Sequence, residues 1–405
     1  MALLAMNIVI LNLYYPPDTS ATAPIIEDIA HALAIKHQVT VLAGRPSYET
    51  TQRHPYYLFN RRAEGRVNVA RVGSTAFHRK IMGGRLINYL SYMTLALISL
   101  PLLRPKPDVI IAMTDPPLVS LIGVFTSRLR SSTFVYNIRD LHPDMAVAAG
   151  VLSRGFIASL WERVHRWVMR RAHLVIVLGE DMKERIASKG VDSRRLVIVR
   201  DGADPAPLLQ TLEHPAVHEI RGEFPFVAVH AGNLGFAGSW DALLEAAKCM
   251  ERENLGLVFV GEGAQRLALE QKASGIHNVR FLPFRPSEEV PYVLAAADLN
   301  VVTVKEGLEG LVVPSKLYPI LMAGRPVLAV APPGSDIARI VQKYHCGLVA
   351  SPNEPQAVVK AMLWARNHPE DLAEMGRRAR EASALFNRQA LLQEFVKTID
   401  NLKGC

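Results

Sequence analysis

Cysteine is scarce in this chain of 405 residues, which contains only Cys249, Cys346 and Cys405. Their wide spacing matches neither a disulfide framework nor a metal motif, so we expect a reducing compartment. Aromatic residues make up 7% of the sequence, too few to indicate the stacking platforms that bind single-stranded nucleic acid. The apolar stretch 1–5 is too short for a signal peptide. These absences favour a globular cytoplasmic protein without a nucleic-acid partner.

Acidic residues are sparse in the first half of the chain. Residues 1–200 contain 26 lysines and arginines against 14 acids, whereas residues 201–405 contain 20 against 24. The net charge of +8 therefore comes entirely from the first half. Such an asymmetry predicts an anionic partner for that half. Because no nucleic-acid module is visible, an anionic membrane surface is the favoured partner.

Short apolar segments alternate with helical patterns in two series along the chain. The first series runs from residues 7–13 to 173–178, and the second from 226–230 to 347–350. Apolar strands that alternate with helices are typical of parallel sheets covered on both faces. We therefore predict an α/β protein with two doubly wound Rossmann-like domains, whose parallel sheets face each other across a cleft.

A proline-containing stretch between the two series predicts a linker. The predicted parts are an N-terminal domain at 1–203, the linker at 204–222, a C-terminal domain at 223–385 and a closing helix at 386–405. The N-terminal domain is the basic one, so we expect it to face the membrane. The closing helix is expected to pack back toward the N-terminal domain.

The segment 311–326 combines a loop, a helical pattern and a strand. Pro314, Ser315 and Lys316 precede an apolar helical pattern that ends at Gly324, and a buried-type strand follows directly. Unpaired N–H groups at a helix N-terminus, together with a hydroxyl and an ammonium group, suit phosphate oxygens. The alternative is a helix cap at Ser315 and a solvated charge at Lys316.

Six short motifs lie at the turns of the predicted fold. They are Tyr14–Asp18, Ile138–Asp144, Ala231–Gly235, Gly261–Gly263, Glu309–Lys316 and Ala323–Val327. With these motifs the chain resembles the family 4 glycosyltransferases of the GT-B fold. The resemblance covers essentially the whole chain and is closest to the bacterial polysaccharide and O-antigen assembly branch with a Pro-Ser-Lys motif.

The resemblance implies a retaining transfer of a hexose or N-acetylhexosamine from a nucleotide-sugar, with UDP or GDP, to a lipid-linked saccharide. The N-terminal domain would bind the acceptor and the C-terminal domain the donor. No cofactor or obligatory metal is implied, because a lysine and backbone N–H groups stand in for the metal. The implied location is cytoplasmic, peripherally associated with the inner face of the cell membrane.

On the donor side, Lys316 is the expected cation for the leaving diphosphate, with Pro314 and Ser315 beside it. Asn233 and Gly235 lie in a strand-to-helix turn, where the backbone can approach a phosphate. These five residues are the candidate donor contacts of the loops. An ordinary turn is the alternative for Asn233 and Gly235.

Glu309 is expected to bind a hydroxyl of the donor sugar, as the first glutamate of the family does, or else to be a solvated loop carboxylate. Ser335 and Asp336 open a later helical pattern and are expected as caps, with contact to the donor as the alternative. The paired glutamates of many family members are absent, since Leu311 and Pro319 occupy their places. That departure motivates two alternatives: a non-catalytic nucleotide-sugar-binding or scaffold protein, and a sugar-nucleotide epimerase on the same fold.

On the acceptor side, Asp140, His142 and Asp144 follow a buried-type strand, at the edge where parallel sheets bind ligands. Asp140 and His142 are the candidate catalytic residues, because a carboxylate or imidazole there can orient or deprotonate the acceptor hydroxyl. In retaining relatives the leaving phosphate is thought to take that proton. Asp144 and Asp18 are candidate acceptor-binding residues. The alternatives are a capping or surface role for His142 and a turn-forming role for Asp18.

Two segments are candidates for membrane contact. Residues 155–171 show an amphipathic helical pattern with arginines on one side, although packing on the chain's own domain also explains it. Residues 86–103 carry no charge, but their polar residues favour burial or shallow lipid contact over a membrane span. The basic residues that flank this second segment are Arg79, Lys80, Arg85, Arg104 and Lys106.

Overall fold

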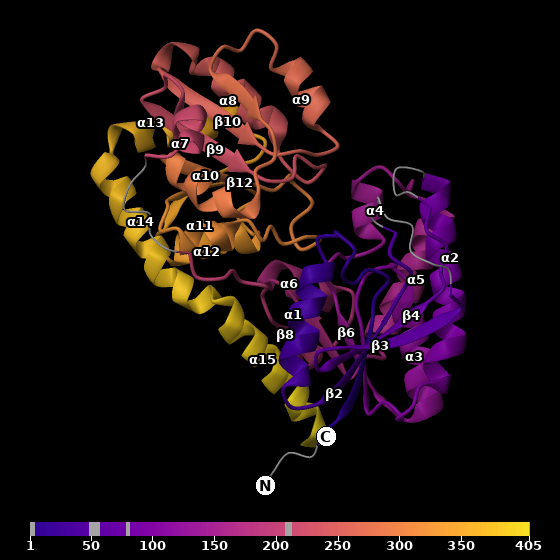
Figure 1. Cartoon of the computed structure of the whole chain (residues 1–405). Coiled ribbons are helices and arrows are strands. Elements are labelled where there is room, and N and C mark those ends of the chain that lie inside the picture. Colours follow the sequence, from indigo (N-terminus) through magenta and orange to yellow (C-terminus); the bar gives the residue numbers. More distant parts are fainter. Residues whose placement is uncertain (1–4, 48–56, 78–81, 207–212, 405) are drawn as a thin grey trace.

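The computed structural model describes residues 5–47, 57–77, 82–206 and 213–404, which form two α/β domains (Figure 1). Each domain contains one largely parallel sheet with helices packed on it. The predicted fold class is therefore confirmed, because both sheets have the Rossmann-like arrangement of parallel strands and crossover helices. Arg79 and Lys80 lie outside the described residues.

The N-terminal sheet has the strand order β3-β4-β2-β1-β5-β6-β7-β8. Its neighbouring strands are parallel, except that β3 runs antiparallel to β4. The strands are β1 (Asn7–Leu11), β2 (Gln38–Ala43), β3 (Phe59–Glu64), β4 (Val67–Val72), β5 (Val109–Ala112), β6 (Thr133–Asn137), β7 (Leu174–Val177) and β8 (Leu196–Ile198). Every residue of β5 and β7 is buried, as expected for central strands covered on both faces.

Helices flank this sheet on both faces. They are α1 (Ala23–Ala34), α2 (Met82–Ser99), α3 (Val119–Arg130), α4 (Asp144–Ala148), α5 (Phe156–Met169) and α6 (Glu180–Ser188). The helix α2 packs beside α3, and α3 packs beside α5, on the right-hand side of the domain in Figure 1. These three helices therefore form one continuous outer layer.

The C-terminal sheet has the order β11-β10-β9-β12-β13-β14, and all its strands are parallel. The strands are β9 (Phe226–Ala231), β10 (Leu255–Val260), β11 (Val279–Leu282), β12 (Leu299–Thr303), β13 (Val327–Val330) and β14 (Gly347–Ala350). The helices are α7 (Pro215–Arg221), α8 (Trp240–Cys249), α9 (Arg266–Lys272), α10 (Val290–Ala296), α11 (Leu317–Met322), α12 (Asp336–Lys343) and α13 (Pro355–Asn367). The helix α7 packs on α10, so part of the stretch expected as a linker contributes to the core of this domain.

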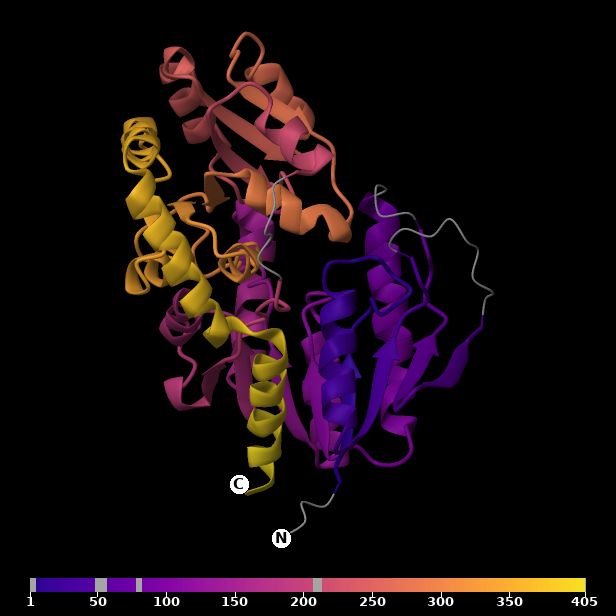
Figure 2. The ribbon, with the colours of Figure 1, turned by 60° about the vertical axis from the view of Figure 1, so that its left-hand side comes forward.

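The last two long helices, α14 (Pro369–Ser383) and α15 (Arg388–Asp400), run from the C-terminal domain back to the N-terminal one (Figure 2). The helix α15 packs on α1, where Arg388 Nη1 lies 2.9 Å from Asp28 Oδ2. At its end, His37 Nε2 lies 2.7 Å from Asp400 Oδ1. The closing helix thus contacts the first domain through both packing and polar bonds.

The uncharged segment 86–103 forms most of α2 and a short 3-10 turn at Leu100–Leu102. Within the described residues, no helix is both long enough and apolar enough to cross a membrane. Several large apolar side chains of α2 are nevertheless exposed. They are Leu86, Ile87, Leu90, Leu97 and Ile98.

Candidate active site

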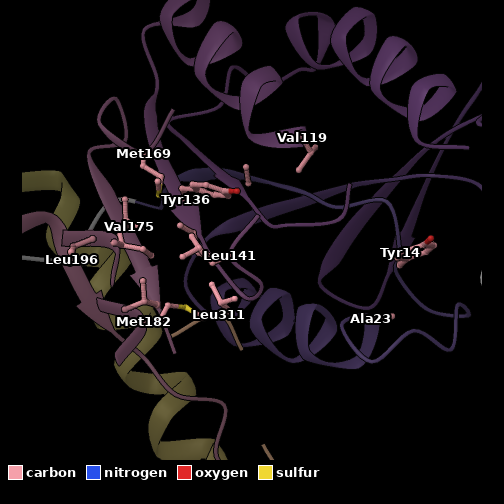
Figure 3. Close-up of a cluster of buried hydrophobic side chains, with 14 of the residues drawn as sticks. Tyr14, Ala23, Val119, Tyr136, Leu141, Met169, Val175, Met182, Leu196 and Leu311 are labelled. Carbon is pink, nitrogen blue, oxygen red and sulfur yellow. The ribbon is translucent and has the colours of Figure 1, made fainter. Parts of the chain in front are cut away.

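The two domains touch where β6 and β12 end. The backbone N–H of Leu141, after β6, donates to the carbonyl oxygen of Leu311, after β12, at 3.1 Å. Both side chains lie in one buried apolar cluster (Figure 3). Because parallel sheets bind ligands at the carboxyl ends of their strands, the loops around these two residues define the candidate active site.

On the C-terminal side, Lys316 reaches the turn that follows β9. Its Nζ donates to the carbonyl oxygen of Asn233 at 3.2 Å. The backbone of Gly232 has a φ of +125°, and a Cβ there would lie 2.4 Å from Cε of Lys316. Only glycine allows the lysine to lie so close to this turn. The structure therefore brings together Lys316 and Asn233, which lie 83 positions apart in the sequence.

A second turn, after β10, supports the first. The N–H of Gly232 donates to the carbonyl oxygen of Val260 at 2.8 Å, and the N–H of Leu234 donates to that of Glu262 at 2.8 Å. A Cβ on Gly261 would lie 2.1 Å from the carbonyl oxygen of Gly232. Side chains are thus excluded between the two turns, which fixes the backbone that faces Lys316.

A buried aromatic cluster underlies the donor turn. The indole Nε1 of Trp240 donates to the carbonyl oxygen of Gly235 at 2.7 Å. The ring of Trp240 packs edge-on against His230, with 4.8 Å between centroids. Burial and the nearby charge of Lys316 lower the pKa of His230 to about 3, so its imidazole is neutral. His230 gave no sequence signal because it lies inside an apolar strand.

Burial also lowers the pKa of the Lys316 ammonium, to about 8. The lysine is therefore still mostly protonated at neutral pH, but it lacks a carboxylate partner among the described residues. A half-buried cation without a counter-ion loses part of its hydration, and an anionic ligand at this place would offset that cost. The side chain is held by one carbonyl oxygen and is available to a phosphate.

The helix that follows Lys316 starts without a side-chain cap. Helix α11 begins at Leu317 with Lys316 at the N-cap position, and no side chain caps it. Because Lys316 and not Ser315 occupies the N-cap position, the capping interpretation of Ser315 is wrong. Pro314 is half-buried and its carbonyl oxygen accepts from the N–H of Leu317 at 3.5 Å.

Glu309 is held at the contact between the domains. Its carbonyl oxygen accepts from Nη1 of Arg185 at 2.9 Å, and the next N–H, of Gly310, donates to Asp181 Oδ2 at 3.1 Å. Within the described part of the chain, Oε2 of Glu309 is buried and has no hydrogen-bond partner. A buried carboxylate oxygen without a donor is unusual and suits a ligand hydroxyl.

On the N-terminal side, Asp140 shares its surroundings with Asp115, which follows β5. Burial, together with the negative charge of Asp115, raises the pKa of Asp140 to about 6. Burial also raises the pKa of Asp115, although the Thr22 hydroxyl donates to its Oδ2 at 2.9 Å. The sequence analysis missed Asp115, yet its position directly after an apolar strand matches that of Asp140.

His142 follows Asp140 by two positions, and its ring is stacked on that of Trp161. The centroids are 5.7 Å apart and the planes differ by 10°. Burial and the charge of Arg85 lower the pKa of His142 to about 4. A neutral imidazole can accept a proton or a hydrogen bond, so the geometry leaves a catalytic role open to His142.

Asp144 and Asp18 instead support local structure. Asp144 forms ion pairs with Lys189 at 2.8 Å and with Arg185 at 3.5 Å. Burial alone would raise the pKa of Asp144, but the hydrogen bond and charge of Lys189 outweigh it and lower the pKa. Asp18 is 5% exposed, and its Oδ1 accepts from the N–H of Ser47 at 2.8 Å.

Ser335 and Asp336 lie at the start of α12. The Ser335 hydroxyl accepts from the N–H of Ala338 at 3.4 Å, so the cap interpretation of this serine is confirmed. Asp336 has a different role, because its Oδ1 lies 2.6 Å from Nη2 of Arg200 in the other domain. Sequence reasoning gave no indication of this interdomain ion pair.

The chain matches two described families, the glycosyl transferase 4-like domain over residues 20–202 and glycosyl transferases group 1 over residues 213–382. The probable glycosyltransferase WbjE of Pseudomonas aeruginosa is 29% identical over 63% of this chain and 65% of the relative. The chain thus spans just under two thirds of WbjE. The putative colanic acid biosynthesis glycosyl transferase WcaI of Escherichia coli K12 is 23% identical over 97% of this chain and 100% of its own length.

Solved structures with the same fold cover nearly the whole chain. Anabaena HepE, in complexes with UDP and with UDP-glucose, matches 98% of this chain and 100% of its own, with a TM-score of 0.68 and 18% identity. WaaG, a glycosyltransferase involved in lipopolysaccharide biosynthesis, matches 97% of this chain and 99% of its own, with a TM-score of 0.65 and 17% identity. The chain therefore has the GT-B fold, with a glycosyl transferase 4-like domain followed by a glycosyl transferases group 1 domain.

Proposed function

We propose that this protein is a retaining glycosyltransferase of cell-surface polysaccharide synthesis. It would move a hexose or N-acetylhexosamine from a UDP- or GDP-sugar to a lipid-linked saccharide. The observation that carries the proposal is Lys316, a half-buried cation that reaches a glycine-lined turn without an acidic partner in the described part of the chain. The names of WbjE and WcaI, and the UDP-glucose complex of HepE, support the same reaction class.

The donor diphosphate would lie on the Gly232–Asn233 turn with its charge against Lys316. As the bond from the anomeric carbon to the phosphate oxygen breaks, negative charge grows on the leaving diphosphate. A fixed cation and backbone N–H groups stabilise that charge most, because they need no reorganisation. Glu309 would bind a donor-sugar hydroxyl through its buried, unpartnered carboxylate oxygen. The proposal therefore needs no metal ion.

The acceptor hydroxyl would lie near Asp140 and His142. Its oxygen forms the new bond to the anomeric carbon, and its proton leaves to the departing phosphate or to one of these two groups. A carboxylate with a pKa of about 6 can accept a hydrogen bond from the hydroxyl throughout the neutral range. Asp18 and Asp144 would act indirectly, by holding the loops of this side in place.

The proposal includes a peripheral position on an anionic membrane, at the cytoplasmic face where lipid-linked saccharides are elongated. Exposed apolar side chains on α2 and α5 support this position, with Phe156 at 82% exposure. A shallow groove of about 670 Å³ on α5 is lined by the basic and aromatic residues Arg163, Arg166, Trp167, Arg170 and Arg171. Arginine and tryptophan at the edge of an apolar face suit the headgroup region of a bilayer.

A nucleotide panel tests the donor site. Thermal unfolding of the wild type, of Lys316→Ala and of the exposed control Lys360→Ala is measured with UDP, GDP, dTDP, ADP and CMP. A ligand at 100 times its dissociation constant adds about 2.7 kcal/mol to the free energy of unfolding. We expect UDP or GDP to stabilise the wild type and the control. Lys316→Ala should bind at least about tenfold more weakly, since a charged hydrogen bond is lost.

The panel also separates the alternatives. No stabilisation by any nucleotide would favour a scaffold protein over an enzyme. Binding without release of nucleoside diphosphate when lipid-linked acceptor is added would indicate a non-catalytic nucleotide-sugar-binding protein. Interconversion of the free nucleotide-sugar would indicate an epimerase. Wild-type affinity in Lys316→Ala would contradict the phosphate assignment itself. Addition of a chelator should leave transfer unchanged, because no step depends on a metal ion.

A further inference from the structure

The first two turns of α2 lie on a boundary between two kinds of surface. On the outer side, Leu86 and Leu90 are 59% and 56% exposed. On the inner side are the loops after β5 and β6 with Asp115 and His142, whose pKa values both respond to the charge of Arg85. Arg85 itself is exposed and belongs to the same two turns. It therefore stands between an apolar surface and the acceptor side of the candidate active site.

The Arg85 guanidinium is oriented but not neutralised. Its Nε donates to the hydroxyl of Tyr89 at 2.6 Å, and its central carbon lies 5.3 Å from the centroid of the Tyr89 ring. In the part of the chain that the structure describes, no carboxylate forms an ion pair with it. Tyr89 thus orients the guanidinium of Arg85, and its two Nη atoms can still bind two oxygens. Such a pre-oriented fork matches a phosphate group.

A lipid-linked saccharide presents its parts in a fixed order, which is sugar, then phosphate, then hydrocarbon. The surface of the N-terminal domain presents matching groups in the same order. The carboxylates of Asp115 and Asp140 suit sugar hydroxyls, Arg85 suits phosphate, and Leu86 and Leu90 suit hydrocarbon. Besides Arg85, the cation whose charge acts on Asp115 is Arg139, and Arg139 is already paired with Asp201.

We propose that Arg85, oriented by Tyr89, binds the phosphate that joins the acceptor saccharide to its lipid. This inference deepens the proposed function and rests on it for the identity of the ligand. Arg85 would position the acceptor rather than act in the chemical step. By fixing the phosphate, it would set how far the sugar reaches toward Asp140, and it would select acceptors with a phosphate at that place.

Farnesyl diphosphate is a suitable probe because it carries the phosphate and hydrocarbon without a sugar. Its binding is measured by calorimetry below its critical micelle concentration, with farnesol as the phosphate-free comparison. We expect the wild type and the control Arg62→Ala, an exposed arginine of β3, to bind the diphosphate with equal affinity. Arg85→Ala should bind it at least tenfold more weakly. Tyr89→Phe should lie between, since it loses the hydroxyl that orients the guanidinium.

Two further arms distinguish this site from the donor site. Excess UDP should not displace farnesyl diphosphate, and Lys316→Ala should bind it as the wild type does. Displacement by UDP would overturn the inference, because the probe would then occupy the donor site. Equal binding of farnesol, or unchanged affinity in Arg85→Ala, would overturn it as well. Binding requires no turnover, so a protein that binds the probe through Arg85 but transfers no sugar would contradict the proposed function alone.

Discussion

Two histidines of the site, His142 and His230, are neutral because burial lowers the pKa of His142 to about 4 and that of His230 to about 3. Neither can supply positive charge at physiological pH. Lys316 and Arg85 are cations on the two sides of the site, and neither has an acidic partner among the described residues. The two proposed phosphate contacts rest on these side chains, one in each domain.

Asp140 should control the acid side of the pH profile. Its pKa is raised from 3.8 to about 6, so its carboxylate becomes protonated as the pH falls through 6. If the carboxylate orients the acceptor hydroxyl, kcat/KM for the acceptor should fall about tenfold per pH unit below pH 6. Asp140→Asn should have low activity and lack this dependence. Initial rates between pH 4.5 and 8.5 measure both.

The raised pKa of Asp140 also affects the stability of the folded protein. A carboxyl group whose pKa is raised on folding destabilises the native state when it ionises, so the free energy of unfolding should fall as the pH rises from about 4 to about 6. Asp140→Asn should weaken that fall. Asp144→Asn is the matched control, because the pKa of Asp144 is lowered and it does not titrate in this range. If the fall in kcat/KM below pH 6 persists in Asp140→Asn, Asp140 is not the group that causes it.

At the scale of elements, α6 and α12 are joined across the domain contact by acidic residues. Asp336 at the start of α12 pairs with Arg200, and its Oδ1 accepts from the N–H of Glu180 at 2.9 Å. Asp181 Oδ2 accepts from the N–H groups of Gly310 and Asp336, at 3.1 and 2.9 Å. Each carboxylate thus replaces water as the partner of backbone groups at the start of a helix.

Asp336→Ala should destabilise this contact strongly. Asp336 is 2% exposed, so its removal leaves Arg200 without its carboxylate partner and the N–H of Glu180 unpaired. The expected loss is about 3 kcal/mol in the free energy of unfolding. Asp241→Ala is the control, because its carboxylate is 75% exposed in the pair with Lys272 and should contribute less than about 1 kcal/mol. Urea denaturation of both variants checks the contrast, and equal losses would contradict it.

The elements that the sequence predicted best are the central strands. Residues 109–113 are apolar throughout because β5 is buried on both faces, and that pattern is visible without a structure. Helix α7 was concealed within the expected linker, since Pro215 suggested a break although it occupies the first helical position. The pair of Asp336 and Arg200 joins residues 136 positions apart, and no local pattern encodes such a distance.

In the candidate site, too, the sequence indicated where residues lie but not all of their contacts. Lys316 and Asn233 were predicted as donor residues, and the structure brings them into contact. Both could be predicted because each lies in a motif at a turn, and the fold brings these turns together at the carboxyl edge of the C-terminal sheet. Asp18 and Asp144 lie near the expected edge too, but their oxygens are taken by a backbone N–H and by Lys189. Sequence position shows where a carboxylate lies but not which partner it has already found.

The whole molecule is electrically uneven, with a basic N-terminal half and exposed apolar side chains on α2 and α5. We therefore expect it to bind vesicles that contain anionic phospholipid and not vesicles of neutral lipid. Binding in a sedimentation assay should fall steeply between 0.05 and 1 M salt, because the Debye length falls to about 3 Å at 1 M. Binding that is independent of salt would indicate insertion in place of surface attachment.

A double substitution tests which face makes that contact. Phe156→Ser with Ile157→Ser removes two exposed apolar side chains from the first turn of α5 without opening the core. Vesicle binding should weaken at least about tenfold, since each side chain contributes about 1.5–3 kcal/mol when buried in an apolar phase. The matched control, Leu267→Ser on the exposed surface of α9, should bind as the wild type does. Equal loss in the control would mean that α5 is not the contact face.

The chain passes from one domain to the other twice, and the two passages lie side by side. The N–H of Ala203 donates to the carbonyl oxygen of Phe386 at 3.0 Å, and the N–H of Arg388 donates to that of Ala203 at 3.0 Å. Two chain crossings that are hydrogen-bonded in this way can bend together, but the bonds oppose sliding of one crossing past the other. We therefore expect any opening of the two domains to be a rotation about the axis through these two crossings. The gap between the domains would widen most at the margin farthest from these two crossings, and the proposed nucleotide-sugar would enter there.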